Sequence, residues 1–177
     1  REAFERSRER LLRDRVDIVP LHNPSQTAIE TGEATGVLRS LKAEGHIAAW
    51  GVSAGSAAVA RVALAQGAEV VELLYNVLMT DDLHELASDL AQHGAGVLAR
   101  SVLAHGLLTG HWGPEREFAL GDHRRDRWTS EELRARLSQL DVVRPLVQAD
   151  VRSLRAAALR FVLTNQLVSS AVLGPRS

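Results

Sequence analysis

Residues 16–24 read Val-Asp-Ile-Val-Pro-Leu-His-Asn-Pro, and this stretch decides the fold. A short apolar run rich in Val and Ile is typical of a buried strand. Asn23 and Pro24 end the run and open a turn. We therefore expect His22 at the carboxyl end of a strand, which is the end where parallel α/β barrels carry out their chemistry. The alternative is a hydrogen-bonded rim histidine with no catalytic role.

The chain around this stretch alternates strand and helix patterns. Apolar runs predict strands over 16–21, 47–52, 70–74, 96–99 and 169–173. Helical spacing and capping residues predict helices over 3–12, 34–43, 57–66, 82–92, 129–147 and 153–164. This order predicts a parallel sheet covered by helices, in one domain over 1–177. The spacing suits a TIM-type barrel or a doubly wound sheet, and the lack of a Gly-x-Gly-x-x-Gly motif after any strand disfavours the second.

Five strands do not close a barrel that is built on eight. Arg1 lies inside a helical pattern with no capping residue before it, so we expect the chain to start partway through an element. Bare strand edges favour aggregation. We therefore expect either a missing N-terminal segment or a homo-oligomer partner to cover them.

Composition narrows the classes of function. The 177 residues are 45% hydrophobic and 24% charged, with a formal net charge of −1, which argues against nucleic-acid or membrane-surface binding. The chain has no cysteine, so it has neither disulfides nor a thiolate metal site. Its histidines lack metal-ligand spacing, and we predict no metal. No apolar run reaches the length of a membrane span, and no leader pattern is visible, so we expect a soluble, cytoplasmic protein.

Five segments, in order, resemble the aldo-keto reductases from the fourth to the eighth strand of their barrel. The family patterns are Tyr-Ile-Asp-Leu-x-x-Leu-His-x-Pro, Glu-Gly-Lys-Ile-Arg-x-x-Gly-Val-Ser, Asp-Val-Val-Gln-x-x-Tyr-Asn, Gly-Val-x-Ala-x-Ser-Pro-Leu-x-x-Gly-Leu-Leu-Thr-Gly and Leu-Arg-Phe-Val-Leu with a Pro-Gly end. The matching residues are 16–24, 38–53, 69–76, 96–110 and 159–177. The resemblance implies an α/β fold, an incomplete TIM-type (β/α)8 barrel of about five parallel βα units.

The resemblance also implies an activity: reduction of an aldehyde or ketone by NADPH without a metal. The family's catalytic set is Asp, Tyr, Lys and His, and His22 matches the histidine. Its imidazole N–H would orient the substrate and stabilise charge on the carbonyl oxygen. The other three residues come from earlier strands, which this chain does not contain. Tyr75 matches a Tyr-Asn pair after the sixth strand and not the family's acid.

Two strand-end residues match the family's contacts to the nicotinamide carboxamide. Ser53 matches its serine, although Ala54 replaces the usual Asn, and a simple turn or helix cap is the alternative role. Glu72 replaces a Gln, and an ionised Glu accepts a hydrogen bond from an amide –NH2 but cannot donate one. In an apolar strand this carboxylate is expected to need a partner or to become neutral.

The loop after the fourth strand matches the family's cofactor loop. Arg100 would stack on the nicotinamide. Ser101, Leu103 and Gly106 match positions that receive the diphosphate, where a missing side chain would permit close approach. Val102 in place of Pro makes the loop less rigid. An ordinary βα loop is the alternative.

The end of the chain resembles the start of the segment that holds the adenosine 2′-phosphate. Gly174 belongs to it, and Arg176 would pair with that phosphate, which implies NADP as cofactor. A solvated terminal arginine is the alternative. The charged run 121–125 either borders the cofactor or is a solvated cluster, and the second is favoured.

Three functions stay open. The first is an NADP(H)-linked reductase of a small carbonyl substrate whose N-terminal catalytic half is absent from this chain. The second is a non-catalytic subunit that binds a nicotinamide or a partner. The third is a truncated barrel reused as a lyase or isomerase, with His22 and Glu72 as acid and base.

Overall fold

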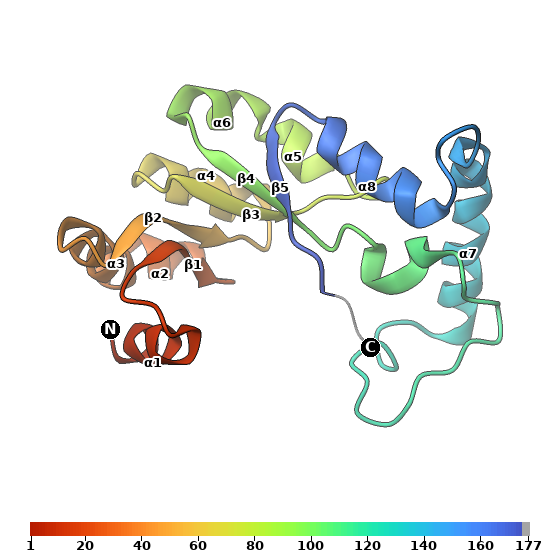
Figure 1. Cartoon of the computed structure of the whole chain (residues 1–177), viewed down its shortest axis with the longest axis horizontal. Helices are drawn as coiled ribbons and strands as arrows, with labels where there is room; N and C mark the ends of the chain where they lie inside the picture. The colour runs from red at the N-terminus through yellow and green to blue at the C-terminus, as the bar shows by residue number, and fades with distance from the viewer. Residues whose placement is uncertain (175–177) are drawn as a thin grey trace.

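The computed structural model describes residues 1–174, which form one five-stranded parallel sheet and its helices (Figure 1). The strands pair in chain order, β1-β2-β3-β4-β5, and every pairing is parallel. They are β1 (Val16–His22), β2 (Ile47–Ser53), β3 (Val70–Leu74), β4 (Gly96–Arg100) and β5 (Val168–Ala171). Sequential order is that of a barrel, whereas a doubly wound sheet reverses its order partway. Since β1 and β5 do not pair, the described sheet is an incomplete barrel, as predicted.

Capping side chains begin several of the helices. Ser25, Ser56 and Ser153 each accept a hydrogen bond from the backbone N–H three residues ahead. Thr129 and Glu132 form a reciprocal capping box, as the sequence predicts. The helices are α1 (Glu2–Leu11), α2 (Gln26–Glu30), α3 (Glu33–Ala43), α4 (Ala57–Ala65), α5 (Asp81–Glu85), α6 (Ala87–His93), α7 (Ser130–Val143) and α8 (Leu154–Thr164), with 3₁₀ turns η1 (Ala104–Thr109) and η2 (Arg144–Leu146).

Several helix predictions need correction. The helix predicted over 82–92 is two helices, α5 and α6, which meet at the buried Leu86. The helix predicted to 147 ends at Val143, because Pro145 lacks the N–H that would continue it. Both α2 and η1 lie in segments that the sequence left irregular.

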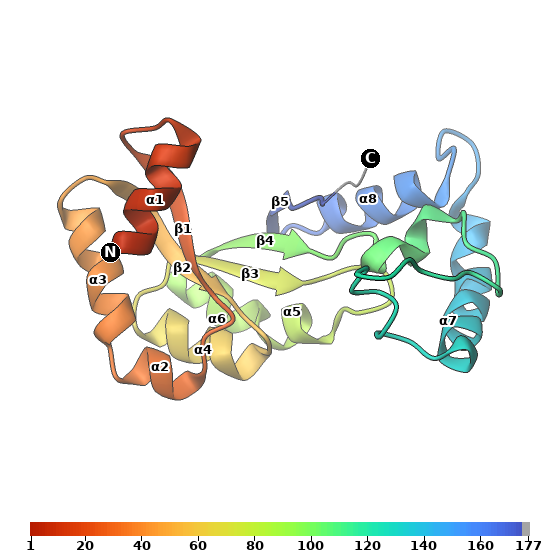
Figure 2. The ribbon, with the colours of Figure 1, turned by 90° about the horizontal axis from the view of Figure 1, so that it is seen from below.

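The two faces of the sheet have different surroundings. One face packs under the helices, and its strand residues are buried: Trp50, Val52, Val71, Leu73, Val97 and Ala99. The opposite face, called the inner face here, carries the alternate residues of each strand. A second apolar cluster joins η1, α7 and α8 to the loop 110–128. Figure 2 places α7 and this loop at the opposite end of the molecule from α1 and α3.

Candidate functional site

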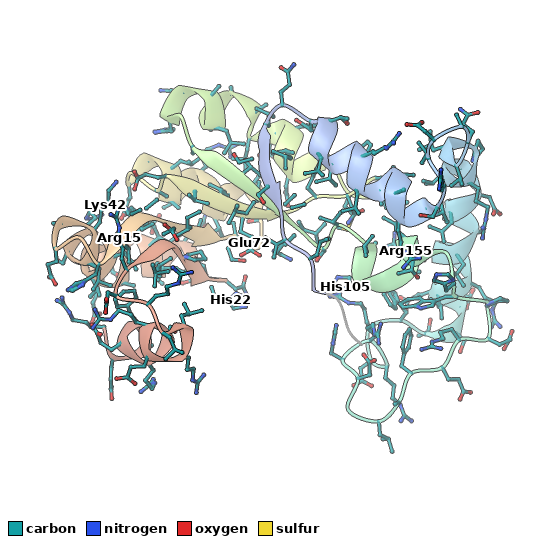
Figure 3. All side chains as sticks on the ribbon, viewed as in Figure 1. Arg15, His22, Lys42, Glu72, His105 and Arg155 are labelled. Atoms are coloured by element: carbon teal, nitrogen blue, oxygen red, sulfur yellow. The ribbon has the colours of Figure 1, made fainter. Side chains whose placement is uncertain are left out.

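Three polar residues form a row at the carboxyl ends of neighbouring strands. His22 of β1 is in register with Ser53 of β2, which is in register with Glu72 of β3. Register partners in a parallel sheet point to the same side, so all three lie on the inner face. Strand spacing puts His22 and Glu72 roughly 10 Å apart, with Ser53 between them. We call this set the polar row, and Figure 3 labels its two outer members.

Glu72 does not lie in the apolar surroundings that the sequence predicts for it. Its strand neighbours Val71 and Leu73 are buried under the helices, but Glu72 faces the inner side and is only partly buried. Its side chain forms no hydrogen bond or ion pair within residues 1–174, and solvent reaches it. The apolar surroundings from which a need for a partner was predicted are therefore absent on this side of the strand.

A cavity of about 480 Å³ lies at the carboxyl end of β4, the strand that pairs with β3. It extends from the end of β4 over η1 and the loop 110–128 to α8 and the residues after β5. This volume is in the usual range for small-ligand sites. Its wall contains five of the predicted cofactor residues: Arg100, Ser101, Leu103, Gly106 and Gly174. We call it the basic cavity, because its wall also contains His105, His123, Arg124 and Arg155.

Most of the positively charged residues of the basic cavity were not predicted as site residues from the sequence. Arg124 belongs to the run 121–125, which was interpreted as a solvated cluster, yet it is only partly exposed and lines the cavity. Aromatic residues in the same loop were the available signal, since Trp112 and Phe118 both contact its guanidinium. Arg155 gave no signal, because one arginine on a helix is usually solvated. Arg176 lies outside the described residues.

Arg100 connects the polar row to the basic cavity. Its Nη2 donates to the Ala54 carbonyl oxygen at 3.1 Å, just past Ser53. The same side chain lines the cavity, and its buried Nε has no hydrogen-bond partner within residues 1–174. The ends of β2 and β4 are thereby joined across β3.

The loop after β4 has an unusual backbone. Ser101, Ala104 and His105 all have positive φ, between 47° and 58°, which is costly for residues other than glycine. Asn76 is buried, and its Nδ2 donates to the Ser101 carbonyl oxygen at 3.0 Å. Clusters of strained residues of this kind are typical of ligand-binding loops.

Gly106 lies in close contact with Trp112. Its φ is +109°, and a Cβ built there would lie 2.5 Å from Cζ2 of Trp112. The missing side chain at Gly106 thus leaves room for a tryptophan ring, and the close approach of a diphosphate to Gly106 stays a prediction. Because Gly106 has no side chain, the Trp112 ring can pack against it and form part of the cavity wall.

The pKa of His105 reports the charge in the cavity. Burial is the main cause that lowers this pKa below its usual 6.5, and the positive charges of Arg127, His123, Arg100 and Arg124 lower it further. The smaller contributions reflect the cationic side chains that surround His105.

Tyr75 is a structural residue. It is 2% exposed, its ring stacks on Phe161 of α8 with centroids 5.5 Å apart, and its hydroxyl accepts a hydrogen bond from Asn165 Nδ2 at 2.8 Å. Its hydroxyl is therefore engaged beside α8, and this packing agrees with the prediction that Tyr75 is not the proton donor.

Neither a metal site nor a membrane-spanning helix occurs within residues 1–174. No three His, Asp or Glu side chains gather there closely enough to hold a metal ion. No helix in that range combines the length and the apolar character needed to cross a membrane.

A sequential parallel sheet with polar strand ends and a basic cavity defines part of a (β/α) barrel with a ligand site. The chain belongs to the Aldo/keto reductase family, whose model matches residues 1–177. Enzymes of this family are oxidoreductases that use a nicotinamide cofactor.

Individual relatives agree with this assignment. The chain is 28% identical to a D-threo-aldose 1-dehydrogenase of a Pseudomonas species over 98% of its own length and 52% of the relative's. It resembles the holo form of an aldo-keto reductase from Bacillus halodurans at 25% identity and a TM-score of 0.75, covering 99% of this chain and 54% of that one. A glycerol dehydrogenase from Gluconobacter oxydans has the same fold, at 24% identity and a TM-score of 0.77, over 97% of this chain and 54% of that one. The chain thus spans about half the length of these relatives.

Proposed function

We propose that this chain takes part in the NADP(H)-dependent reduction of an aldehyde or ketone. The observation that carries the proposal is the polar row, with His22 at its end, at the same edge of the sheet as the end of β4, where the basic cavity begins. In this proposal His22 is the catalytic residue. The cofactor-binding residues are Ser53, Glu72, Arg100, Ser101, Leu103, Gly106, Gly174 and Arg176.

The residues present fit a phosphorylated nicotinamide cofactor. Polar groups on the inner face suit the carboxamide, and several cations surround a cavity that suits the phosphates. When bound, the nicotinamide supplies the hydride. Ser53 and Glu72 hold the carboxamide, with Glu72 accepting from its –NH2 group. NADP as the specific cofactor and a cytoplasmic location stay predictions.

His22 has the position that this chemistry needs. It is exposed on the inner face, so a carbonyl substrate can reach its imidazole. A ring N–H of His22 donates to the carbonyl oxygen, which orients the substrate and stabilises the negative charge that develops there. The family's proton donor and its Asp and Lys partners have no counterpart in residues 1–177, so in this proposal another segment or chain supplies them.

A second function is favoured by one observation: binding of the nicotinamide without turnover. Tyr75 is the only tyrosine, and it is buried and bonded to Asn165. The chain therefore has no tyrosine on the inner face to act as the acid. This chain alone would then bind the cofactor and leave a carbonyl substrate unchanged.

The open edge of the sheet supports the proposed need for a further segment or a second copy. Within residues 1–174, β1 pairs only with β2. Ile18 on this strand is 37% exposed, and Leu12 nearby is 90% exposed. Covering this edge would remove an aggregation hazard.

The test is a fluorescence titration of NADPH with the purified chain, beside a second titration with NADH. We expect saturable binding that favours NADPH, and we expect His22→Ala to bind equally well. Reduction of a simple aldehyde is then followed through NADPH absorbance, with and without a supplied N-terminal half. Absence of NADPH binding contradicts both functions, and binding without turnover even in the presence of that half selects the second.

A further inference from the structure

Asn76 joins the two loops that leave β3 and β4 at the same edge of the sheet (Figure 2). The proposed function gives this residue no role, although it is only 1% exposed. Its Nδ2 donates to the Ser101 carbonyl oxygen at 3.0 Å, and its Oδ1 accepts from the Leu78 N–H at 2.9 Å. A backbone N–H only donates and a carbonyl oxygen only accepts, so these two partners fix the orientation of the amide.

The turn that carries Asn76 has hydrogen bonds of its own. The backbones of Asn76 and Met79 exchange two hydrogen bonds, at 3.1 and 3.0 Å, and Oδ1 closes the turn through Leu78. Val77 and Leu78 then pack against the apolar cluster of η1, α7 and α8. The side-chain amide is therefore presented to the loop after β4 by an ordered turn.

Ser101 needs such a partner because its backbone conformation is unfavourable. Its φ is +55°, in the left-handed region where the Cβ of a residue other than glycine is crowded. Its carbonyl oxygen accepts from the Ala104 N–H at 2.8 Å within the loop, and from Asn76 across to the neighbouring strand end. Ser101 also belongs to the wall of the basic cavity. The bond from Asn76 thus ties a strained residue of the cavity wall to β3.

We propose that Asn76 is a positioning residue, which holds Ser101 in its left-handed conformation and keeps the loop after β4 in the shape that binds the cofactor. Asn76 is absent from the cavity wall, so it acts through Ser101 and not by touching the ligand. When such a loop relaxes, only a fraction of the molecules is competent to bind, and the apparent dissociation constant rises by the inverse of that fraction. The identity of the ligand as a nicotinamide dinucleotide rests on the proposed function.

The test compares Asn76→Asp and Asn76→Ser with the wild-type chain. Both variants keep an oxygen that can accept from the Leu78 N–H, but at pH 8 a carboxylate only accepts and a serine hydroxyl is too short to reach Ser101. Asn165→Asp is the matched control. Asn165 makes the same pair of bonds beside α8, accepting from a backbone N–H at 3.0 Å and donating to the Tyr75 hydroxyl at 2.8 Å.

Two quantities are measured: the dissociation constant of NADPH and the rate of hydrogen exchange at the Ala104 amide, which donates to Ser101. We expect both Asn76 variants to bind NADPH about tenfold more weakly and to exchange the Ala104 amide faster, whereas Asn165→Asp keeps both wild-type values. In a Ser101→Gly background the same Asn76 substitutions should cost less than about threefold in affinity, because glycine adopts a positive φ without support. Circular dichroism melts verify that each variant is folded.

The outcomes separate this inference from the proposed function. If the wild type binds NADPH, then wild-type affinity or wild-type exchange in the Asn76 variants overturns the positioning role and leaves the proposed function standing. An equal loss of affinity in Asn165→Asp overturns it in favour of general destabilisation, and an undiminished loss in the Ser101→Gly background shows that Asn76 does not act through Ser101. If the wild type binds no NADPH, the proposed function fails, whereas faster exchange at Ala104 in the Asn76 variants still supports the positioning role.

Discussion

Substitution of Gly106 by alanine tests whether the wall of the basic cavity depends on one close contact. At φ +109° an alanine pays about 1–2 kcal/mol of backbone strain. The added Cβ would also lie 2.5 and 2.9 Å from Cζ2 and Cη2 of Trp112. That ring is packed against Phe118 at a centroid distance of 5.0 Å, so it cannot move freely. Overpacking of this kind costs about 1–3 kcal/mol more.

Gly121→Ala is the matched control for this prediction. Gly121 has φ +82°, but nothing lies within 4 Å of a Cβ built there, so only the backbone strain applies. Chemical denaturation followed by circular dichroism should therefore show Gly106→Ala to be less stable than Gly121→Ala by about 1–3 kcal/mol. When both glycine variants also carry Trp112→Ala, most of the difference in stability between them should disappear. Equal stability of the two glycine variants would refute the assigned contact.

Three further predictions concern the same fold. Because burial and neighbouring cations lower the pKa of His105 below 6.5, the unfolded chain takes up a proton that the folded chain excludes. The free energy of unfolding should therefore fall as the pH drops from 6.5 toward that lowered pKa, and His105→Gln should lessen the fall in denaturation curves recorded at several pH values. Thr129→Ala removes the capping box and should destabilise the protein by about 1 kcal/mol in the same assay, whereas Ser130→Ala should not. Tyr75→Phe removes the hydrogen bond from Asn165 and should cost about 1 kcal/mol. NADPH binding to Tyr75→Phe should stay unchanged, and a loss of binding there would contradict the structural role.

The strands were predictable from sequence because they are buried on the helix side. Val71, Leu73, Val97 and Ala99 are all fully buried, and such runs are distinctive in sequence. The first strand was found from its apolar run and the turn at Asn23, but the prediction that it is buried is wrong, because it lies at the edge of the sheet and none of its residues is buried. The break at Leu86 was not predictable, since this residue continues the apolar spacing on both sides and only tertiary packing divides α5 from α6.

The positions of the candidate site residues could be predicted where they follow from the ends of the strands. Contacts that depend on neighbouring side chains could not be predicted. His22, Ser53 and Glu72 come together because parallel strands end at one edge of the sheet. The partial exposure of Glu72 depends on which face of the sheet is covered, and the strand pattern did not show that. The contact of Gly106 with Trp112 joins a turn to a loop residue whose position no periodicity determines.

Arg100 links the strand ends of the polar row to the basic cavity. Its backbone carbonyl accepts the N–H of Tyr75, and its guanidinium donates to Ala54, so the ends of β2, β3 and β4 are connected through one residue. The Ala54 N–H in turn donates to the Glu72 carbonyl oxygen at 2.9 Å. A ligand that extends from the cavity onto the inner face would therefore contact a backbone whose strand ends are already fixed. Preorganisation of this kind lowers the entropy lost on binding, which suits an elongated ligand with phosphates at one end and a flat polar ring at the other.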